Sequence, residues 1–220
     1  MKNNNLGQRF INVGCGAHPI KGWINYDFNF FIFFSKVRII REILNRLKCI
    51  PNGYKIFMDQ VINENIKFAN AGKHIPERDN SVNVIYSSHM LEHLDREETD
   101  VFLSESKRVL VPDGIIRIVV PDFEKLIENY QKNKNPQKFI DDSCLSGEKP
   151  KALLKKIQYL IQGHGWHFCM YNKTSIIALF KRHGFQNIRV IPAGETMIPF
   201  PDRLDLNVHE NNSLYLEANI

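Results

Sequence analysis

The chain has 220 residues, of which 43% are hydrophobic and 24% are charged. This length and composition are typical of one folded domain with a sizeable core, and they exclude a disordered chain. The net charge of +5 is only a mild excess and is not gathered in a dense Lys/Arg patch. The composition therefore does not favour a nucleic-acid-binding protein.

Two buried strands separated by a glycine turn open the predicted fold. The first covers Arg9–Val13 and runs into Gly14–Gly16, and the second covers Trp23–Asp27 and ends on an acid. The spacing of apolar residues then predicts a helix over Lys36–Cys49. Further short strands are predicted over residues 66–69 and 82–87.

The remainder of the chain continues to alternate between helices and strands. Helices are predicted over residues 96–110 and 173–183, and strands over 115–120, 187–191 and 213–218, with a turn at 112–114. Strands that alternate with helices predict an α/β fold with a mostly parallel sheet and helices on both faces. The Lys-, Asn- and Pro-rich segment 131–156 is interpreted as an insertion within this domain.

The four cysteines are scattered along the chain and form no CxxC pair: Cys15, Cys49, Cys144 and Cys169. This pattern favours neither a zinc ribbon nor a disulfide framework, and it fits a reducing cytoplasm. The N-terminus leads straight into the first strand, so we expect no signal peptide. The most apolar run, residues 30–34, is too short to span a bilayer.

The glycine turn and the acid after it predict a binding site for an adenosine-containing cofactor. Ligands of open α/β sheets bind beyond the carboxyl ends of the strands. Gly14 and Gly16 let the backbone approach a ligand closely, and Asp27 can accept both hydroxyl hydrogens of a ribose. A Gly-x-Gly alone equally predicts an ordinary tight turn, but with the acid it is moderately specific.

The same segment distinguishes between two cofactor classes. A dinucleotide site needs a third glycine and a helix N-terminus for the pyrophosphate. This chain has Pro19 at the corresponding position, and the connection from Gly14 to Trp23 is too short for a helical crossover. A nicotinamide dehydrogenase is thus disfavoured, whereas S-adenosylmethionine carries no phosphate and needs no such cradle.

Several blocks, in order, resemble the motifs of class I S-adenosylmethionine-dependent methyltransferases. Residues 11–16 and 22–27 resemble the first two motifs, and 75–85 resembles the "LPF-x-D-x-S-x-D-x-V" block. Residues 87–94 and 108–114 resemble the "LEHL" and "RVLKPGG" segments. The Gly-Trp-Ile-Asn-x-Asp variant and the ending at 212–218 are similar to a small bacterial subgroup linked to surface-polysaccharide synthesis.

The resemblance implies a Rossmann-like, seven-stranded sheet with an antiparallel C-terminal hairpin. It also implies which residues contact the cofactor: Gly14, Cys15 and Gly16 at the aminoacyl and ribose groups, Asp27 with the neighbouring Phe28 at the ribose, Asn70 and Ala71 near the adenine, and Ser87 and Ser88 near the methionyl end. The chain departs from the family pattern at Asn12, Asn83 and Asp113. The first two remove negative charge near the end of the sheet.

A hydroxyl acceptor benefits from a general base, and the candidates are His167, Asp122 and His89. His167 lies in the loop Gly163–His167, whose two imidazoles and Trp166 suit stacking on a sugar or aromatic ring. His167 equally suits a packing or capping role, which is the favoured role for His164, and His93 is assigned a structural role at a helix start. A metal site from His164, His167 and Cys169 lacks a fourth ligand, so none is predicted.

Residues 28–50 combine aromatic and aliphatic residues with five basic ones: Lys36, Arg38, Arg41, Arg46 and Lys48. Two interpretations stay open, a helix on an anionic membrane and a lid over the cofactor, and general grounds favour the lid. We therefore expect one methyltransferase domain over residues 1–220, with a helical lid insertion at 28–56 and an acceptor-side insertion at 123–170. The sequence does not indicate an oligomeric state.

The function expected from these patterns is methyl transfer from S-adenosylmethionine to a hydroxyl of a small molecule or saccharide. Two alternatives stay open. The acceptor can be an amine or a protein side chain, which requires no base, or the chain can be a non-catalytic module that binds S-adenosylmethionine. Gly14, Gly16 and Asp27 argue against a loss of cofactor binding.

Overall fold

The computed structural model of the protein describes residues 7–46, 52–145, 166–201 and 203–220. Its strands are β1 (Phe10–Val13), β2 (Ile24–Asp27), β3 (Lys67–Phe68), β4 (Val82–Ser88), β5 (Leu110–Pro121), β6 (Gln186–Ile191) and β7 (Ser213–Asn219). Its helices are α1 (Phe31–Lys36), α2 (Arg38–Arg46), α3 (Asn52–Asn63), the 3₁₀ turn η1 (Leu91–His93), α4 (Arg96–Val109), α5 (Phe123–Asn133), α6 (Pro136–Ser143) and α8 (Lys173–Arg182).

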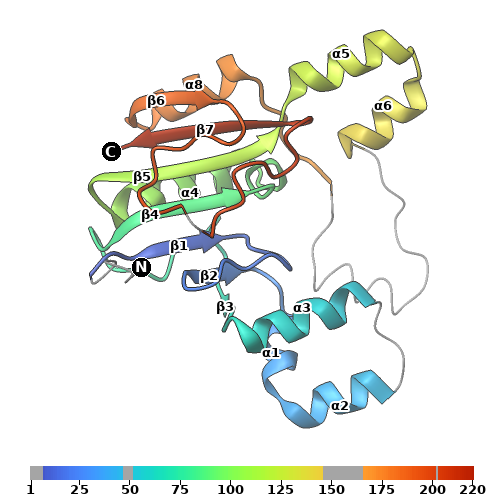
Figure 1. The fold of residues 1–220 in the computed structure, drawn as a ribbon, viewed down its shortest axis with the longest axis vertical. Helices are drawn as coiled ribbons and strands as arrows, with labels where there is room; N and C mark the ends of the chain where they lie inside the picture. The colour runs from blue at the N-terminus through green and yellow to red at the C-terminus, as the bar shows by residue number, and fades with distance from the viewer. Residues whose placement is uncertain (1–6, 47–51, 146–165, 202) are drawn as a thin grey trace.

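The seven strands form one sheet in the order β3-β2-β1-β4-β5-β7-β6 (Figure 1). The pairs from β3 to β5 are parallel, and β7 runs antiparallel to both β5 and β6. Central strands such as β1 are buried on both faces, as parallel strands are. The predicted Rossmann-like sheet with an antiparallel C-terminal hairpin is confirmed.

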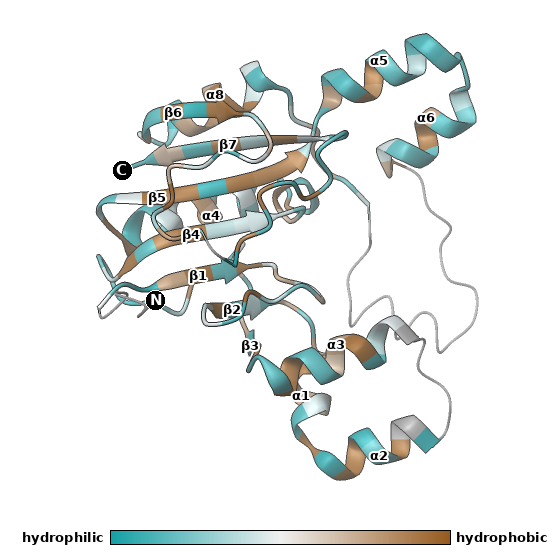
Figure 2. Cartoon of the chain, viewed as in Figure 1, coloured by the Kyte–Doolittle hydropathy of each residue, from teal (hydrophilic) through white to brown (hydrophobic). Residues whose placement is uncertain are grey.

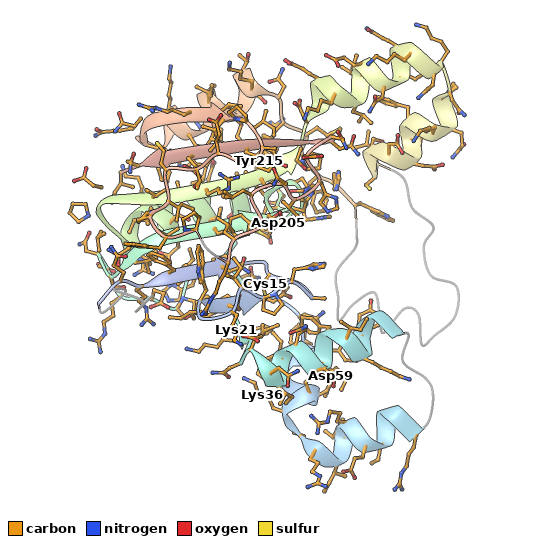
Figure 3. All side chains as sticks on the ribbon, in the orientation of Figure 1. Cys15, Lys21, Lys36, Asp59, Asp205 and Tyr215 are labelled. Carbon is orange, nitrogen blue, oxygen red and sulfur yellow. The ribbon has the colours of Figure 1, made fainter. Side chains whose placement is uncertain are left out.

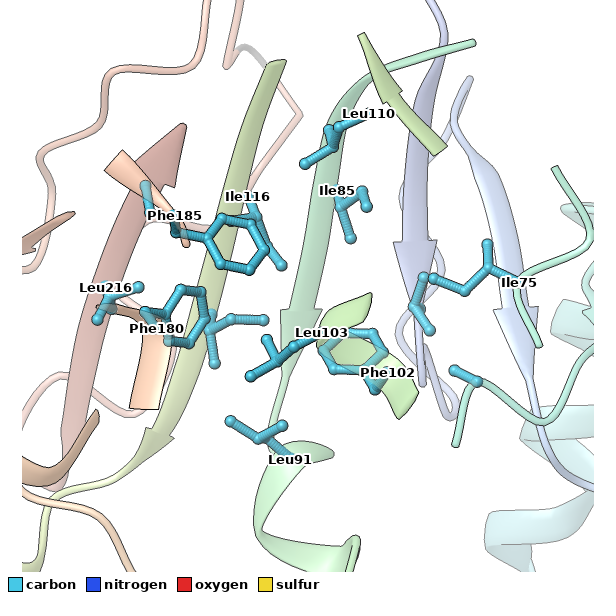
Figure 4. Close-up of a cluster of buried hydrophobic side chains, with 14 of the residues drawn as sticks. Ile75, Ile85, Leu91, Phe102, Leu103, Leu110, Ile116, Phe180, Phe185 and Leu216 are labelled. Atoms are coloured by element: carbon cyan, nitrogen blue, oxygen red, sulfur yellow. The ribbon is translucent and has the colours of Figure 1, made fainter. Parts of the chain in front are cut away.

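Helices α4 and α8 cover one face of the sheet. Phe102 and Leu103 of α4 and Phe180 of α8 are fully buried against residues such as Ile85 and Ile116 of the central strands (Figure 4). α4 begins with a capping box, in which Asp95 accepts from the Glu98 N–H and Glu98 accepts from the Asp95 N–H. The buried side chains of α4 hold the helix against the central strands of the sheet.

Loop segments pack on the opposite face. Ile20, Ile198 and Leu204 lie against Tyr86 and Tyr215, in a second buried cluster. The loop that holds Asp205 crosses in front of the strand that carries Tyr215 (Figure 3). Arg117 of β5 and Glu217 of β7 form a buried ion pair, and both side chains also hydrogen-bond to the backbone of this loop.

Two helical arms extend beyond the carboxyl ends of the parallel strands. α1, α2 and α3 lie next to the β3 edge, and α5 and α6 follow the end of β5 (Figure 1). A third cluster, which includes Ile32 of α1 and Phe57 and Val61 of α3, packs the first arm against Cys15. Among the helices that the structure describes, none has both the length and the apolar character needed to cross a bilayer.

Two predicted elements differ from the structure. The helix predicted over Lys36–Cys49 is interrupted at Val37, which has extended dihedral angles and separates α1 from α2; residues 47–49 lie outside the described chain. The turn predicted at 112–114 is instead a bulge within β5, because Val82 pairs with Leu110 and Val84 with Ile115. Asp113 has a left-handed φ of 61° there, a conformation that aspartate tolerates.

Candidate functional site

A cavity of about 560 Å³ opens at the carboxyl ends of β1, β2 and β4. This is the edge where open α/β sheets bind their ligands. Its lining comes from the loops after β1, β2, β3 and β4, from η1 and α4, from α3, and from the segment before α8. The residues are Val13, Gly14, Gly16, Asp27, Phe28, Tyr54, Ala69, Asn70, Ala71, Gly72, His89, Met90, His93, Leu94, Glu98 and Phe168.

The glycine turn after β1 is held against the end of β2. The N–H groups of Gly14 and Cys15 both donate to the carbonyl of Tyr26, at 2.9 and 3.1 Å. Gly14 has a φ of 71°, and a Cβ on it would collide with the side chain of Met90. Glycine is required here for both reasons, and the exposed backbone of the turn forms one wall of the cavity.

Asp27 lies at the rim of the cavity and is fixed by the same turn. The Gly16 N–H donates to Asp27 Oδ2 at 2.7 Å, which leaves Oδ1 available to a ligand. Burial raises the pKa of Asp27 to about 6, and the Gly16 hydrogen bond lowers it in part. A carboxylate in this position can accept hydrogen bonds from a ribose diol.

The structure brings most of the predicted cofactor residues together. Gly14, Gly16, Asp27, Phe28, Asn70 and Ala71 all line the cavity. The side chain of Asn70 accepts from the Gly72 N–H at 3.1 Å, which shapes the wall opposite the glycine turn.

The other three predicted cofactor residues are not in the lining. Cys15 packs with Ile32 and Phe57 of the first arm, and burial raises the pKa of its thiol. Ser87 is buried near the end of β4, and Ser88 follows it immediately before the cavity residue His89.

His89 is the expected base that the structure places in the cavity wall. It has a left-handed φ of 51°, which is uncommon for a residue with a Cβ and is typical of functional sites. Its Nε2 lies 3.1 Å from Ser213 Oγ, and its Nδ1 lies 3.2 Å from Glu92 Oε1. The hydrogen bond with Ser213 therefore positions the ring, and Nδ1 faces the carboxylate of Glu92 without forming a hydrogen bond to it.

His167 lies behind this wall. Its side chain is 9% exposed, and its Nε2 is 4.0 Å from Glu92 Oε1. Its ring makes an edge contact with the ring of His93, with the centroids 5.0 Å apart. Burial lowers the pKa of His167, although the neighbouring Glu92 raises it in part. His164, the other imidazole of the predicted loop, lies outside the described residues.

Asp122 has a different local role. Its side chain caps α5 by accepting from the Glu124 N–H at 3.0 Å. It lines a separate hollow of about 230 Å³ together with Asn129, Lys138 and Asn212. The structure therefore separates Asp122 from the cavity that contains Asp27.

Sequence reasoning missed two residues beside the expected bases. Glu92 was given no role and His93 only a structural one, yet His93 lines the cavity and Glu92 is buried beside three imidazoles. Both belong to the segment that resembles "LEHL", so the signal was present. Their approach to His167 depends on backbone bonds from Phe168 and Cys169 to the Glu92 carbonyl, which no spacing reveals.

Comparisons with known proteins match part of the chain to a family model. A family model described as a methyltransferase domain matches residues 51–118, a stretch that includes β3, β4, η1 and α4. No curated protein matches the chain. The family model supports a methyltransferase domain in this part of the chain.

The chain is also similar to several solved structures. One is an S-adenosylmethionine-dependent methyltransferase from Thermotoga maritima, with a TM-score of 0.49 and 15% identity over 96% of this chain and 81% of that chain. A second, from Archaeoglobus fulgidus, has a TM-score of 0.48 and 14% identity over 97% and 86%. A third is phosphoethanolamine N-methyltransferase 2 of Haemonchus contortus with bound S-adenosylmethionine, with a TM-score of 0.47 and 13% identity over 97% and 48%.

Proposed function

We propose that this protein transfers the methyl group of S-adenosylmethionine to a hydroxyl group of a small molecule or saccharide. The observation that carries the cofactor assignment is the joint placement of the glycine turn and Asp27 on one cavity. Residues 14–23 pass from β1 to β2 through turns, and no helix forms in this described stretch. The turn after β1 therefore offers no helix N-terminus to a pyrophosphate, whereas Asp27 offers an acceptor to a ribose.

The reaction is an in-line displacement. The acceptor oxygen forms a bond to the methyl carbon as the sulfur–carbon bond breaks, and the electron pair of that bond stays on sulfur. The hydroxyl proton passes to water or to a neighbouring imidazole, and S-adenosylhomocysteine is the second product. The enzyme contributes alignment and exclusion of water, because both reactants are held in one cavity.

The acceptor side of this proposal is the cluster formed by His89, Glu92, His93 and His167. His89 and His93 line the same cavity as Asp27, so an acceptor oxygen can approach both the cofactor and the imidazoles. Asp122 receives no role in the proposal because its carboxylate caps α5 beside another hollow. A saccharide acceptor is the choice that the resemblance to polysaccharide-linked methyltransferases favours.

The proposal places the reaction in the cytoplasm, because the scattered cysteines form no CxxC pair and fit a reducing compartment. It also includes a contact between α2 and an anionic lipid surface. Ile39 and Ile43 lie one turn apart on α2 and are 69% and 50% exposed, whereas a lid would cover such residues. Arg38 and Arg46 are exposed on the same helix and supply the matching charge.

Calorimetry with the full chain tests the cofactor assignment. S-adenosylhomocysteine should bind at one site, whereas NAD should show no saturable binding. Tighter binding of NAD than of either S-adenosyl ligand would contradict the proposal. A screen with radiolabelled S-adenosylmethionine and acceptors that carry hydroxyl or amine groups then tests the acceptor class, and transfer to amines alone would exclude the hydroxyl.

A further inference from the structure

Glu92 is a buried carboxylate whose hydrogen-bonding capacity is unused. Its side chain is 1% exposed, and neither of its oxygens has a hydrogen-bond partner among the described residues. The contact of 3.2 Å from His89 Nδ1 lies outside hydrogen-bond geometry. Burial of a carboxylate without a partner is costly, so a positively charged species is expected beside it.

Two further imidazoles converge on this carboxylate. One ligand atom from each of Glu92, His93 and His167 can be chosen so that all three lie within 4.8 Å of one another. The three residues come from two segments that backbone hydrogen bonds hold together, from Phe168 N and Cys169 N to the Glu92 carbonyl at 2.8 and 3.2 Å. The convergence is therefore built into the fold around η1.

One ring nitrogen of His93 is held by the backbone. Its Nδ1 lies 3.0 Å from the backbone carbonyl of Trp166, to which it donates a hydrogen in the neutral tautomer. The lone pair is then on Nε2. Metal-binding histidines commonly donate their other ring N–H to a carbonyl or carboxylate, which fixes the ring and its tautomer.

We propose that Glu92, His93 and His167 bind one divalent transition-metal ion, of which Zn²⁺ is the representative. Two imidazole nitrogens and one carboxylate oxygen are a donor set that suits Zn²⁺ and related ions. Ligand bonds of about 2.0–2.2 Å require the three groups to draw closer than in the structure, through small side-chain rotations. The ion supplies the positive charge that the buried carboxylate lacks.

The position of this site gives the ion a role in the proposed reaction. Three protein ligands leave a coordination position open, and His93 lies in the wall of the cavity. An acceptor hydroxyl bound at that position loses its proton to water more readily, because the ion lowers its pKa. The oxygen then attacks the methyl carbon as described above. This role, unlike the ion site itself, rests on the proposed function.

The test is calorimetric titration of the chelator-treated full chain with ZnCl₂ alone. The wild-type protein should bind one ion, and both Glu92→Gln and His93→Gln should bind it about 100-fold more weakly or worse. His183→Gln is the matched control. That imidazole lies at the end of α8, where it pairs with Asp100 of α4 and takes no part in the proposed site. Circular dichroism checks each fold, and His93→Gln, at a partly exposed residue, carries the test if Glu92→Gln does not fold.

A parallel titration with S-adenosylhomocysteine separates this inference from the proposed function. If S-adenosylhomocysteine binds but Zn²⁺ does not, the metal site is refuted and the proposed function stands. If Zn²⁺ binds but S-adenosylhomocysteine does not, the proposed function fails and the site stands. Equal Zn²⁺ affinity in the wild type and in Glu92→Gln would also overturn the site, and the cluster would then be an imidazolium–carboxylate group.

Discussion

The carboxylate of Asp27 has to be charged in order to accept hydrogen bonds from two ribose hydroxyls, but burial favours its neutral form. Its pKa is raised to about 6, whereas that of an unfolded aspartate is 3.8. In the absence of a ligand, the folded state therefore binds a proton more tightly than the unfolded state. This residue's contribution to stability falls as the pH rises from about 4 to 6, and it is constant above that range.

Cofactor affinity should show the opposite trend. S-adenosylhomocysteine selects the carboxylate form, so we expect a constant dissociation constant above about pH 7 and affinity that weakens about tenfold per pH unit well below pH 6. Asp27→Asn should bind at least about tenfold more weakly at pH 7.5 and should lose most of this dependence. Calorimetry between pH 5 and 8 measures both. An identical pH profile in the variant would assign the dependence to a group other than Asp27.

Arg117 and Glu217 form an ion pair that is fully buried between the sheet and the loop in front of it. Arg117 Nη1 donates to Glu217 Oε1 at 2.6 Å and to the carbonyl of Glu195 at 2.9 Å. The Met197 N–H donates to Glu217 Oε2 at 2.6 Å. One pair of charges thus connects β5, β7 and the loop that packs over them.

Removal of one partner would leave an uncompensated buried charge. Glu217→Ala should reduce the free energy of unfolding by about 3–5 kcal/mol, measured by urea denaturation. Glu42→Ala is the control, because it breaks the exposed Arg38–Glu42 pair and should cost less than about 1 kcal/mol. Similar costs for the two variants would mean that the buried pair is hydrated in solution.

At the scale of elements, the sheet was predictable because buried strands have a local signature. Short runs such as Phe10–Val13 are continuously apolar or nearly so, and turn residues bound them. Local signals failed where the backbone departs from a regular element. α3 was not predicted because it begins at Asn52-Gly53, a pair typical of turns. The break at Val37 was not predicted because the apolar periodicity of the sequence continues through it.

The two sides of the candidate site differ in predictability for a related reason. Gly14, Gly16 and Asp27 are close in sequence, and adjacent parallel strands bring them to one edge, so pattern and topology suffice. Glu92 and His167 are distant in sequence, and their approach depends on the backbone bonds that hold residues 168 and 169 against Glu92 of η1. No periodicity encodes that approach, so the acceptor side was predicted only in part.

The proposed lipid contact of α2 leads to a prediction at the same scale. Its apolar and charged residues alternate around a helix that lies outermost on the first arm (Figure 2). The full chain should cosediment with vesicles that contain phosphatidylserine and should be released by salt, because exposed apolar area and basic charge act together. Ile39→Ser combined with Ile43→Ser should abolish this binding.

The matched control for the lipid surface is Ile140→Ser on α6, which removes an exposed isoleucine from the other arm. It should leave cosedimentation unchanged. Equal binding to vesicles of phosphatidylcholine alone would contradict the electrostatic part of the proposal. A concentration-dependent dimer that the α2 double variant abolishes, in the absence of vesicle binding, would assign the surface to a second copy of the chain.

At the scale of the whole molecule, the cavity is assembled from parts that are stabilised separately. The glycine turn belongs to the sheet, Phe28 precedes the first arm, Tyr54 lies on its α3, and Phe168 lies in the segment that precedes α8. The core clusters under α4 and under the loops hold the sheet without any ligand. A ligand in the cavity therefore contacts the first arm, the segment of Phe168 and a sheet that is already formed.

This arrangement predicts that the cofactor stabilises the whole chain by mass action. A ligand that binds only the folded state at 100 times its dissociation constant adds about 2.7 kcal/mol to the free energy of unfolding. For a domain of this length, that should raise Tm by about 5–11 °C with S-adenosylhomocysteine, measured by scanning calorimetry. NAD at the same concentration should leave Tm unchanged, and Asp27→Asn should show a smaller rise. An equal shift with NAD would mean that the cavity does not discriminate against a pyrophosphate, and the assignment of the cofactor would fail.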